Sequence, residues 1–294
     1  IKSSPLKKDI SVDVVIVGGG ISGLTTAYFL TGKGKKVAVI EDGYIGSGET
    51  GRTTAHLSYA LDRDYSELLK IHSIEKTKLA AESHKAAIDM IEAIVKKEGI
   101  ICNFERLDAY LFGSHANLKR ELEAMHKLNF NKIKFTDCPI GSIKTKCLFF
   151  PWQAQFHVMK YLEGLVKAII KNKGQIFTET HAEEIGSDFI TTDKGFKIKA
   201  KHVVVATNAP VNDNSLYLKQ AAYRTYAIAG IVPKDSIPRV LLWDTEKPYH
   251  YVRTHDYDNF SDLLIIGGED HRTGQKNDGR ERWLALEKWG RKIF

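Results

Sequence analysis

The chain has 294 residues, of which 43% are hydrophobic and 27% are charged. That composition is typical of a globular protein, and the length suggests about two domains. No apolar run in the sequence approaches the roughly 20 residues that a membrane span requires. We therefore expect no membrane segment.

The formal net charge is +7, from 43 lysines and arginines against 36 acidic residues. The basic residues are scattered without a long block, which favours a solvated lysine-rich surface over the alternative of a nucleic-acid-binding face. The cysteines Cys102, Cys138 and Cys147 form no CxxC or CxH pair. We expect reduced thiols in a cytoplasmic protein and no metal site.

The first predicted elements are a strand, a glycine turn and a helix. The β-branched run at residues 13–17 is typical of a buried parallel strand. It leads into Gly18-x-Gly20-x-x-Gly23, the spacing of the dinucleotide fingerprint, and then into a helical pattern up to Leu30. The helix N-terminus would offer unpaired N–H groups and a positive dipole end to phosphates.

A second hydrophobic strand ends on an acidic residue, Glu41, which follows Gly23 by 18 positions. A carboxylate at this distance is typical of one that hydrogen-bonds a ribose 2′-OH, and it disfavours a 2′-phosphate. The alternative is a ligand-free α/β unit in which Glu41 is merely solvated. The order of strand, turn, helix, strand and acid favours the dinucleotide site.

The glycine- and hydroxyl-rich residues 42–57 predict an irregular loop that brings N–H groups and hydroxyls against a flat polar ligand, or else an ordinary crossover. The next patterns predict one long or two abutting helices at 64–98, a strand at 104–112, a helix at 116–128, and short strands at 133–135 and 147–150. This strand-rich sequence indicates an inserted second domain.

Residues 151–157 are expected to lead into a helix at 158–172, followed by strands at 175–178 and 182–185, a hairpin at 189–198 and a buried strand from 202 that returns to the central parallel sheet. Further strands are predicted at 223–231, 249–253 and 263–268, and a helix at 281–294. In the strand at 249–253, alternation places Tyr249, Tyr251 and Arg253 on one face. That face is either a floor for a carboxylate-bearing or planar ligand, or an exposed strand with a surface arginine.

With these elements in order, the chain resembles the FAD-dependent oxidoreductases of the D-amino-acid oxidase superfamily. Within it, the chain resembles the bacterial branch whose members often carry a C-terminal Rieske iron–sulfur domain. The motifs that carry the resemblance lie at residues 15–23, 45–55, 104–110, 151–165, 203–208 and 267–274.

The resemblance implies an α/β fold in which a Rossmann-like FAD/NAD(P)-binding domain carries an inserted antiparallel α+β substrate domain. The implied FAD-binding domain comprises residues 11–100, 151–210 and 263–294, and the implied substrate domain comprises residues 101–150 and 211–262. Members of the family continue beyond the position of Phe294 with a segment that reaches the flavin, and the Rieske ligand spacings Cys-x-His and Cys-x-x-His are not found. We expect this sequence to be either part of a longer protein or a trimmed version of the family fold.

The implied cofactor is FAD. The implied roles of its binding residues are pyrophosphate binding at the glycine turn, ribose binding at Glu41, contacts along the ribityl chain from the 47–54 loop, adenine contact at residue 182 and closure by the strand end at 206–207. The implied cofactor-binding residues are Gly18, Gly20, Ile21, Ser22, Gly23, Glu41, Asp42, Ser47, Thr50, Arg52, Thr53, Thr54, Ala182, Ala206 and Thr207. Arg253 falls where relatives place an arginine for the substrate carboxylate, with Tyr251 beside it as the second catalytic residue.

The implied reaction is oxidation of the C–N bond of a small amine or amino acid by hydride transfer to flavin N5, with electrons passed to O₂ or to a Rieske-type centre of the full-length protein. Three alternatives remain at this stage: a non-catalytic flavin-binding module, a tRNA-modifying flavoprotein, and an NAD-dependent dehydrogenase. The last of these leaves the glycine-rich loop at 46–54 unexplained.

Overall fold

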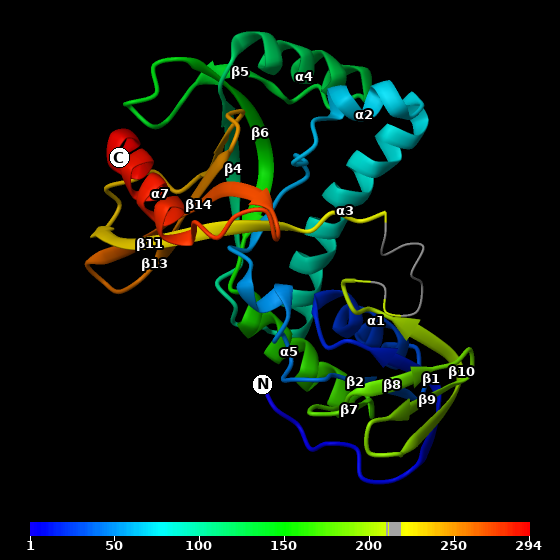
Figure 1. Cartoon of the computed structure of the whole chain (residues 1–294). Coiled ribbons are helices and arrows are strands. Elements are labelled where there is room, and N and C mark those ends of the chain that lie inside the picture. The colour runs from blue at the N-terminus through cyan, green and yellow to red at the C-terminus, as the bar shows by residue number, and fades with distance from the viewer. Residues whose placement is uncertain (210, 212–218) are drawn as a thin grey trace. The chain divides into compact units, whose positions relative to one another are not determined.

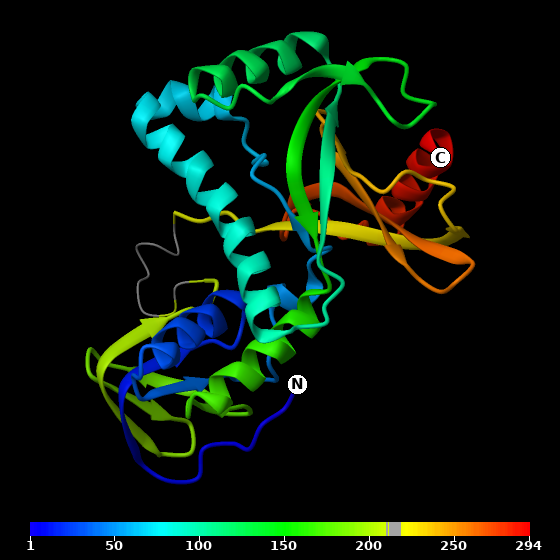
Figure 2. The same cartoon turned by 180° about the vertical axis from the view of Figure 1, so that it is seen from behind.

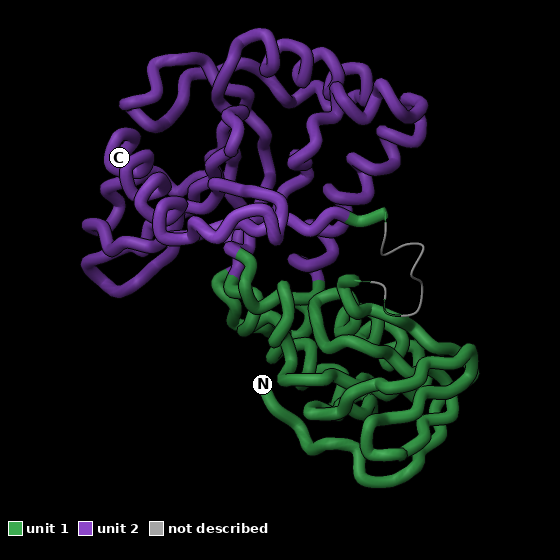
Figure 3. The backbone as a smooth tube through the Cα atoms, in the orientation of Figure 1, with its two compact units in different colours: residues 1–53, 94–103, 157–220 green, residues 54–93, 104–156, 221–294 purple. Residues whose placement is uncertain are grey.

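A computed structural model describes residues 1–209, 211 and 219–294 (Figures 1 and 2). The chain divides into two compact units, shown in Figure 3. Unit 1 comprises residues 1–53, 94–103 and 157–220, and unit 2 comprises residues 54–93, 104–156 and 221–294. The domain boundary predicted between residues 210 and 211 falls at residues 210 and 212–218, which lie outside the described residues.

Unit 1 is built on a sheet with the strand order β7-β2-β1-β10-β9-β8. The first four strands are parallel, and β9 and β8 continue the sheet antiparallel. The elements are β1 (Ile10–Val17), α1 (Ile21–Gly32), β2 (Val37–Ile40), the short 3-10 helix η1 (Glu49–Arg52), α5 (Val158–Lys171), β7 (Gln175–Phe177), β8 (Ala182–Ile185), β9 (Phe189–Thr192) and β10 (Lys197–Val205).

The central strands β1 and β2 of this sheet are buried on both faces. Val15 and Val17 of β1 pack with Ala38 and Ile40 of β2 and with Leu6 of the N-terminal arm in one core cluster. Alternation turns the intervening side chains to the other face, where α1 and α5 pack against each other and against the sheet. Burial on both faces explains why these strands appear in the sequence as continuous hydrophobic runs.

Unit 2 is built on a largely antiparallel sheet with the strand order β11-β14-β13-β12-β4-β6-β3, to which β5 adds beside β6. Its elements are β3 (His56–Leu57), α2 (Tyr65–Ile71), β4 (Glu105–Phe112), α4 (His115–Lys127), β5 (Lys134–Asp137), β6 (Lys146–Gln155), β11 (Tyr223–Pro233), β12 (Leu241–Asp244), β13 (His250–Asp256), β14 (Ser261–Arg272) and α7 (Gly279–Ile293). The helix α3 (Ile74–Glu98) contributes residues 74–93 to this unit and its last turns to unit 1.

Two hydrophobic clusters stabilise unit 2. One contains residues of α2, α3 and α4 with β4 and β6, including Tyr65, Leu118 and Phe150. The other forms where α7 packs on β11 and β14, including Leu286 and Ile266. The unit is therefore an antiparallel α+β structure, and the two units together agree with the predicted α/β fold class.

The domain boundaries differ from the prediction. Residues 263–294 were expected in the FAD-binding domain, but β14 pairs antiparallel with β11 and β13, so this segment lies in unit 2. Residues 54–93 also lie in unit 2. A buried hydrophobic strand has the same sequence pattern in a parallel and in an antiparallel sheet, so the run at 263–268 did not indicate which strands it pairs with.

Three local predictions also need correction. The loop at 42–57 contains η1 and β3 and is not wholly irregular. Residues 151–155 continue β6 before the chain enters α5, and the second strand of the predicted hairpin runs on without a break as β10.

Among the residues that the structure describes, no helix combines the length and apolarity needed to cross a bilayer.

Candidate functional site

The glycine turn after β1 is shaped so that side chains would collide with backbone. Gly18 has φ +112°, and a Cβ there would lie 2.4 Å from the carbonyl oxygen of Ala206. A Cβ on Gly23 would lie 2.0 Å from the carbonyl oxygen of Gly18. Because glycine has no Cβ at either position, the chain can make the tight turn and α1 can pack closely on β1, as the fingerprint predicts.

Gly20 differs from its neighbours because a Cβ there would meet only the Oγ1 of Thr50 within 4 Å, at 3.1 Å. The backbone at Gly20 therefore faces open space beside Thr50. Gly20 is also the N-cap of α1, with no side-chain cap and no acidic residue in the first helical turn. The Ile21 N–H donates to Thr50 Oγ1 at 3.2 Å. Since no carboxylate neutralises this positive helix end, it favours an anion such as a pyrophosphate.

A cleft of ≈ 870 Å³ opens at this helix end, at the carboxyl ends of β1, β2 and β10. Such a volume lies within the roughly 300–1,000 Å³ of ligand sites, and ligands bind parallel α/β sheets at this edge. The predicted residues that line the cleft are Gly18, Gly20, Ile21, Ser22, Glu41, Asp42, Ser47, Thr50, Arg52, Ala182, Ala206 and Thr207.

Glu41 has a role that the spacing alone did not predict. Its Oε2 accepts a hydrogen bond from the Gly19 N–H at 2.7 Å, and its Oε1 accepts from the Gly43 N–H at 3.0 Å and from Ser47 Oγ at 3.1 Å. The carboxylate thus ties the glycine turn to the next loop. A carboxylate has about four acceptor sites, so Glu41 retains acceptor capacity toward the cleft.

Three of the predicted cofactor residues do not line the cleft. Gly23 lies behind it, at the contact between α1 and β1. Thr53 is absent from the lining, and Thr54 belongs to unit 2. The lining residues that the sequence did not single out include Thr180, His181, Glu183 and Asn208. Asn208 has φ +66°, a left-handed conformation that asparagine adopts more readily than most residues. The sequence predicted the end of the strand near this residue but not its left-handed conformation.

Unit 2 holds Arg253, whose side chain is only 6% exposed. Its Nη1 donates to Gln155 Oε1 at 3.1 Å, its Nε is buried without a hydrogen-bond partner, and no carboxylate in the described part of the chain forms an ion pair with it. Burial, with a smaller contribution from Arg239, lowers the pKa of Arg253 to about 10. The guanidinium therefore stays charged at neutral pH, as a buried cation whose remaining donors suit an anionic ligand.

Tyr251 and His56 lie beside this arginine. Their rings meet edge to face, with centroids 5.3 Å apart. His56 Nε2 lies 3.3 Å from the Val252 carbonyl oxygen and Nδ1 lies 3.1 Å from Thr54 Oγ1, so Nε2 carries the proton and Nδ1 accepts from the hydroxyl. Burial and then the charge of Arg253 lower the pKa of His56 to about 4, so this histidine is neutral at physiological pH.

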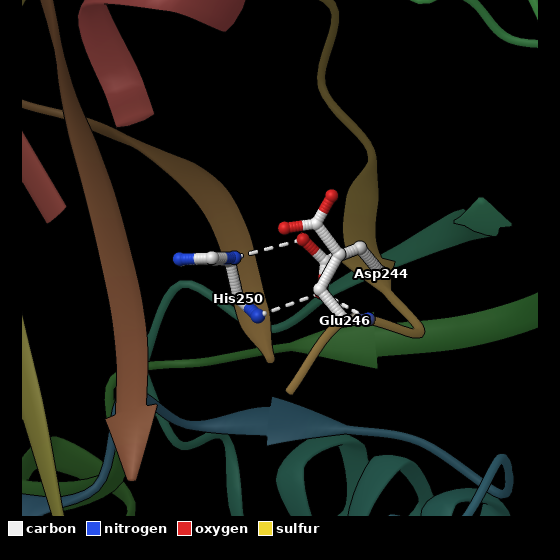
Figure 4. Close-up of side chains that lie close together, drawn as sticks. All are labelled: Asp244, Glu246 and His250. Atoms are coloured by element: carbon white, nitrogen blue, oxygen red, sulfur yellow. Dashed lines mark hydrogen bonds and ion pairs between the residues drawn. The ribbon is translucent and has the colours of Figure 1, made fainter. Parts of the chain in front are cut away.

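A second cluster in unit 2 has the residue types of a metal site, and Figure 4 shows its three side chains, Asp244, Glu246 and His250. His250 Nδ1 donates to Asp244 Oδ2 at 2.8 Å, and Asp244 Oδ1 accepts the N–H groups of Glu246 and His250. His250 Nε2 lies 3.5 Å from Glu269 Oε1. Because both ring nitrogens face carboxylates, the cluster is arranged as an ion-paired histidinium and not as a set of metal ligands.

The comparisons with known proteins agree with this geometry. A family model described as "FAD dependent oxidoreductase" matches residues 13–294. The putative Rieske 2Fe-2S iron–sulfur protein YhfW of Bacillus subtilis is 32% identical over 92% of this chain and 54% of its own length. The gamma-glutamylputrescine oxidoreductase of Escherichia coli is 24% identical over 71% of this chain and 51% of its own length. The chain spans about half the length of these curated relatives.

Solved structures show the same fold. L-proline dehydrogenase from P. horikoshii aligns with a TM-score of 0.76 and 19% identity, covering 98% of this chain and 78% of that chain. Glycine oxidase from Geobacillus kaustophilus aligns with a TM-score of 0.72 and 17% identity, covering 97% of this chain and 78% of that chain. The resemblance that the sequence motifs indicated is confirmed, and the chain belongs to the FAD dependent oxidoreductase family.

Proposed function

We propose that this chain binds FAD through unit 1 and the carboxylate of its substrate through unit 2, in a protein that oxidises the C–N bond of an amine or amino acid. The observation that carries the substrate assignment is the buried guanidinium of Arg253, which has an unpartnered Nε and no carboxylate partner among the described residues. A buried cation of this kind is energetically unfavourable unless an anion pairs with it.

The residues of unit 1 fit the ADP half of FAD. The Gly18–Gly20 backbone and the first N–H groups of α1, from Ile21 and Ser22, would hold the pyrophosphate, and Glu41 with Asp42 would face the adenosine ribose. The proposed adenine and ribityl contacts are the residues Ala182, Ser47, Thr50, Arg52, Thr53 and Thr54, with Ala206 and Thr207 at the strand end. The chemistry that FAD supplies when bound is acceptance of two electrons and a proton from the C–H bond beside an amine nitrogen.

In unit 2 the side chains would bind and orient the substrate without a strong acid or base. Arg253 would hold the carboxylate, and Tyr251 would donate a hydrogen bond, because burial raises the pKa of its phenol and keeps it protonated. The neutral His56 adds no second positive charge beside the amine. Positioning and removal of water are sufficient roles for a site whose cofactor carries the chemistry.

We also propose that an iron–sulfur centre in the whole protein accepts the electrons. This proposal is supported by the name of the B. subtilis relative, a putative Rieske 2Fe-2S iron–sulfur protein, which matches this chain over only 54% of its own length. Molecular oxygen is the alternative acceptor. Release of hydrogen peroxide during turnover would identify oxygen, and its absence together with reduction of an iron–sulfur band would identify the cluster.

The test is the visible spectrum of the purified full-length protein before and after anaerobic addition of amino acids and N-methyl amino acids. The expected result is an oxidised flavin spectrum that bleaches with at least one substrate carrying a carboxylate. A protein without bound flavin, or a flavin that no amine reduces, would contradict the proposed function.

A further inference from the structure

An irregularity in β14 changes which side chains face the arginine. β11 and β14 pair Arg224 with His271 and then Tyr226 with Gly268, so two residues of β14, Glu269 and Asp270, oppose a single residue of β11. Gly268 has φ +140° and Glu269 has φ +57°. This is a β-bulge, a feature that reorients side chains and is common beside functional sites.

The bulge sends its two acidic residues to opposite faces of the sheet. Glu269 reaches the face of β13 that carries His250, whose Nε2 lies 3.5 Å from Glu269 Oε1. Asp270 reaches the other face, called here the arginine face, which carries Tyr249, Tyr251 and Arg253. On it, the Thr225 hydroxyl lies close to both the Asp270 carboxylate and the Tyr251 phenol, and it donates a hydrogen bond to the Gly268 carbonyl oxygen at 3.4 Å.

Asp270 is a carboxylate without a cationic partner. Its Oδ1 is buried and lacks a hydrogen-bond partner in the described structure, and no described lysine or arginine forms an ion pair with it. Burial and then the nearby charge of Asp62 raise the pKa of Asp270. The exposed Asp62 is thus a second negative charge near Asp270. The charges of both carboxylates contribute to raising the pKa values of the Tyr249 and Tyr251 phenols.

The arginine face therefore has opposite charges at its two ends, with tyrosine rings between them. The rings of Tyr249 and Tyr251 lie 5.7 Å apart between centroids. Arg253 pairs across the sheet with Ile265, and the segment from Ile265 to Asp270 would span at most about 16 Å if it were fully extended at about 3.3 Å per residue, with the bulge shortening it. The side chains reach inward along this span, so a ligand that contacts both ends must carry its charges several bonds apart.

We propose that the substrate carries a cationic group, separate from its carboxylate, which binds Asp270 with help from Asp62 while the carboxylate binds Arg253. This inference rests on the proposed function and narrows its substrate class to amino acids with a basic side chain or similarly extended zwitterions. A charged partner supplies the buried oxygen of Asp270 with the hydrogen bond that it lacks. Glycine, whose charges are adjacent, is too short for both ends.

The experiment compares three probes of similar length: lysine, the neutral 6-hydroxynorleucine and the anionic 2-aminoadipate, each as both enantiomers. The readout is anaerobic bleaching of the flavin in the full-length protein, measured against probe concentration. We expect lysine to be favoured over 6-hydroxynorleucine by about tenfold or more, and 2-aminoadipate to be the poorest. Equal bleaching by all three would overturn this inference and leave the proposed function standing.

Substitutions separate recognition of charge from a structural role. Asp270→Asn should remove the advantage of lysine while leaving 6-hydroxynorleucine within about twofold, and Asp270→Lys should shift the preference to 2-aminoadipate. Glu123→Gln, at an exposed acid of α4, is the matched control and should change nothing. The flavin content of each variant is measured first. Equal losses with lysine and 6-hydroxynorleucine in Asp270→Asn would indicate structural damage and overturn the assignment.

Calorimetric titration distinguishes a failure of this inference from a failure of the proposed function. If no amine bleaches the flavin, the proposed function is wrong, and lysine binding to the flavin-loaded protein then decides the charge arrangement. Binding that Asp270→Asn weakens about tenfold would support the arrangement. Absence of binding, or binding unchanged in the variant, would overturn it.

Discussion

The candidate sites of the two units differ in what builds them. In unit 1 the cleft is formed mainly by backbone groups, namely the glycine turn, the first N–H groups of α1 and the ends of three strands. The Glu41 carboxylate links the glycine turn to the next loop by hydrogen bonds. In unit 2, the site consists of side chains from separate strands, with Arg253 on β13, Gln155 on β6 and Asp270 at a bulge in β14. The comparison suggests that unit 1 determines cofactor binding and unit 2 determines substrate choice, so substitutions in the two units should affect different measurements.

The largest effect is expected from Gly23→Val in unit 1. The new side chain would begin 2.0 Å from the carbonyl oxygen of Gly18, so α1 cannot keep its position against β1. We expect complete loss of bound flavin and a lower melting temperature, measured by the flavin-to-protein absorbance ratio and by thermal unfolding. Gly32→Ala, in the same helix but with nothing within 4 Å of the added Cβ, is the control and should retain flavin. Full flavin content in Gly23→Val would refute the packing argument.

The next effect belongs to unit 2. Arg253→Leu should raise the KM of a carboxylate-bearing substrate by roughly 100-fold, because a buried charge-assisted contact is lost, while flavin content stays unchanged. Arg253→Lys should recover part of the affinity, since it keeps the charge and loses the fork geometry. Arg224→Leu, at an exposed position of β11, serves as the control. An unchanged KM in Arg253→Leu would remove the arginine from the substrate site.

A smaller effect is expected from Glu41→Gln. The amide would place a donor against one of the three groups that now donate to the carboxylate, so the glycine turn should loosen. We expect the Kd for FAD, measured by titrating the apoprotein, to rise about tenfold. Glu49→Gln is a matched control, because Glu49 lines the same cleft but forms only an exposed ion pair with Arg52. Equal Kd values for both variants would show that Glu41 does not organise the site.

The smallest effect concerns stability and pH in unit 2. Burial alone would lower the pKa of His250, but the hydrogen bond and charge of Asp244, with Glu269, outweigh it and raise that pKa. The histidinium therefore stabilises the fold fully below its unfolded pKa of about 6.5, and this stabilisation is lost as the pH rises through the folded value. Urea unfolding midpoints should fall between pH 6 and pH 8, and His250→Gln should reduce that slope. His84→Gln, on the exposed side of α3, should retain the slope, and a slope unchanged in His250→Gln would contradict the assignment.

The geometry of the glycine turn and its cleft in unit 1 could be predicted from the sequence because it is local. Gly18, Gly20, Gly23 and Glu41 are close together along the chain, and their spacing carries the physical requirement for a tight turn and a carboxylate beyond it. Alternation also placed Tyr251 and Arg253 on one face correctly. In both cases the geometry follows from one or two neighbouring elements.

The parts that could not be predicted depend on pairing between distant segments. The bulge that turns Asp270 to the arginine face exists only because β14 pairs with Arg224 and Tyr226 of β11 in shifted register, and the glycines at 267 and 268 signal a bulge without giving its direction. The contact between Gln155 and Arg253 joins β6 to β13. The placement of Thr54 and of residues 263–294 in unit 2 likewise follows from sheet order, which hydrophobic pattern does not encode.

The most direct test of the division between cofactor and substrate sites is a crystal structure of the full-length protein with FAD and a carboxylate inhibitor such as 2-furoate. The expected result is the pyrophosphate of FAD against the Gly18–Gly20 backbone at the N-terminus of α1 and the inhibitor carboxylate against the guanidinium of Arg253. FAD bound away from the glycine turn, or a carboxylate that makes no contact with Arg253, would contradict the account.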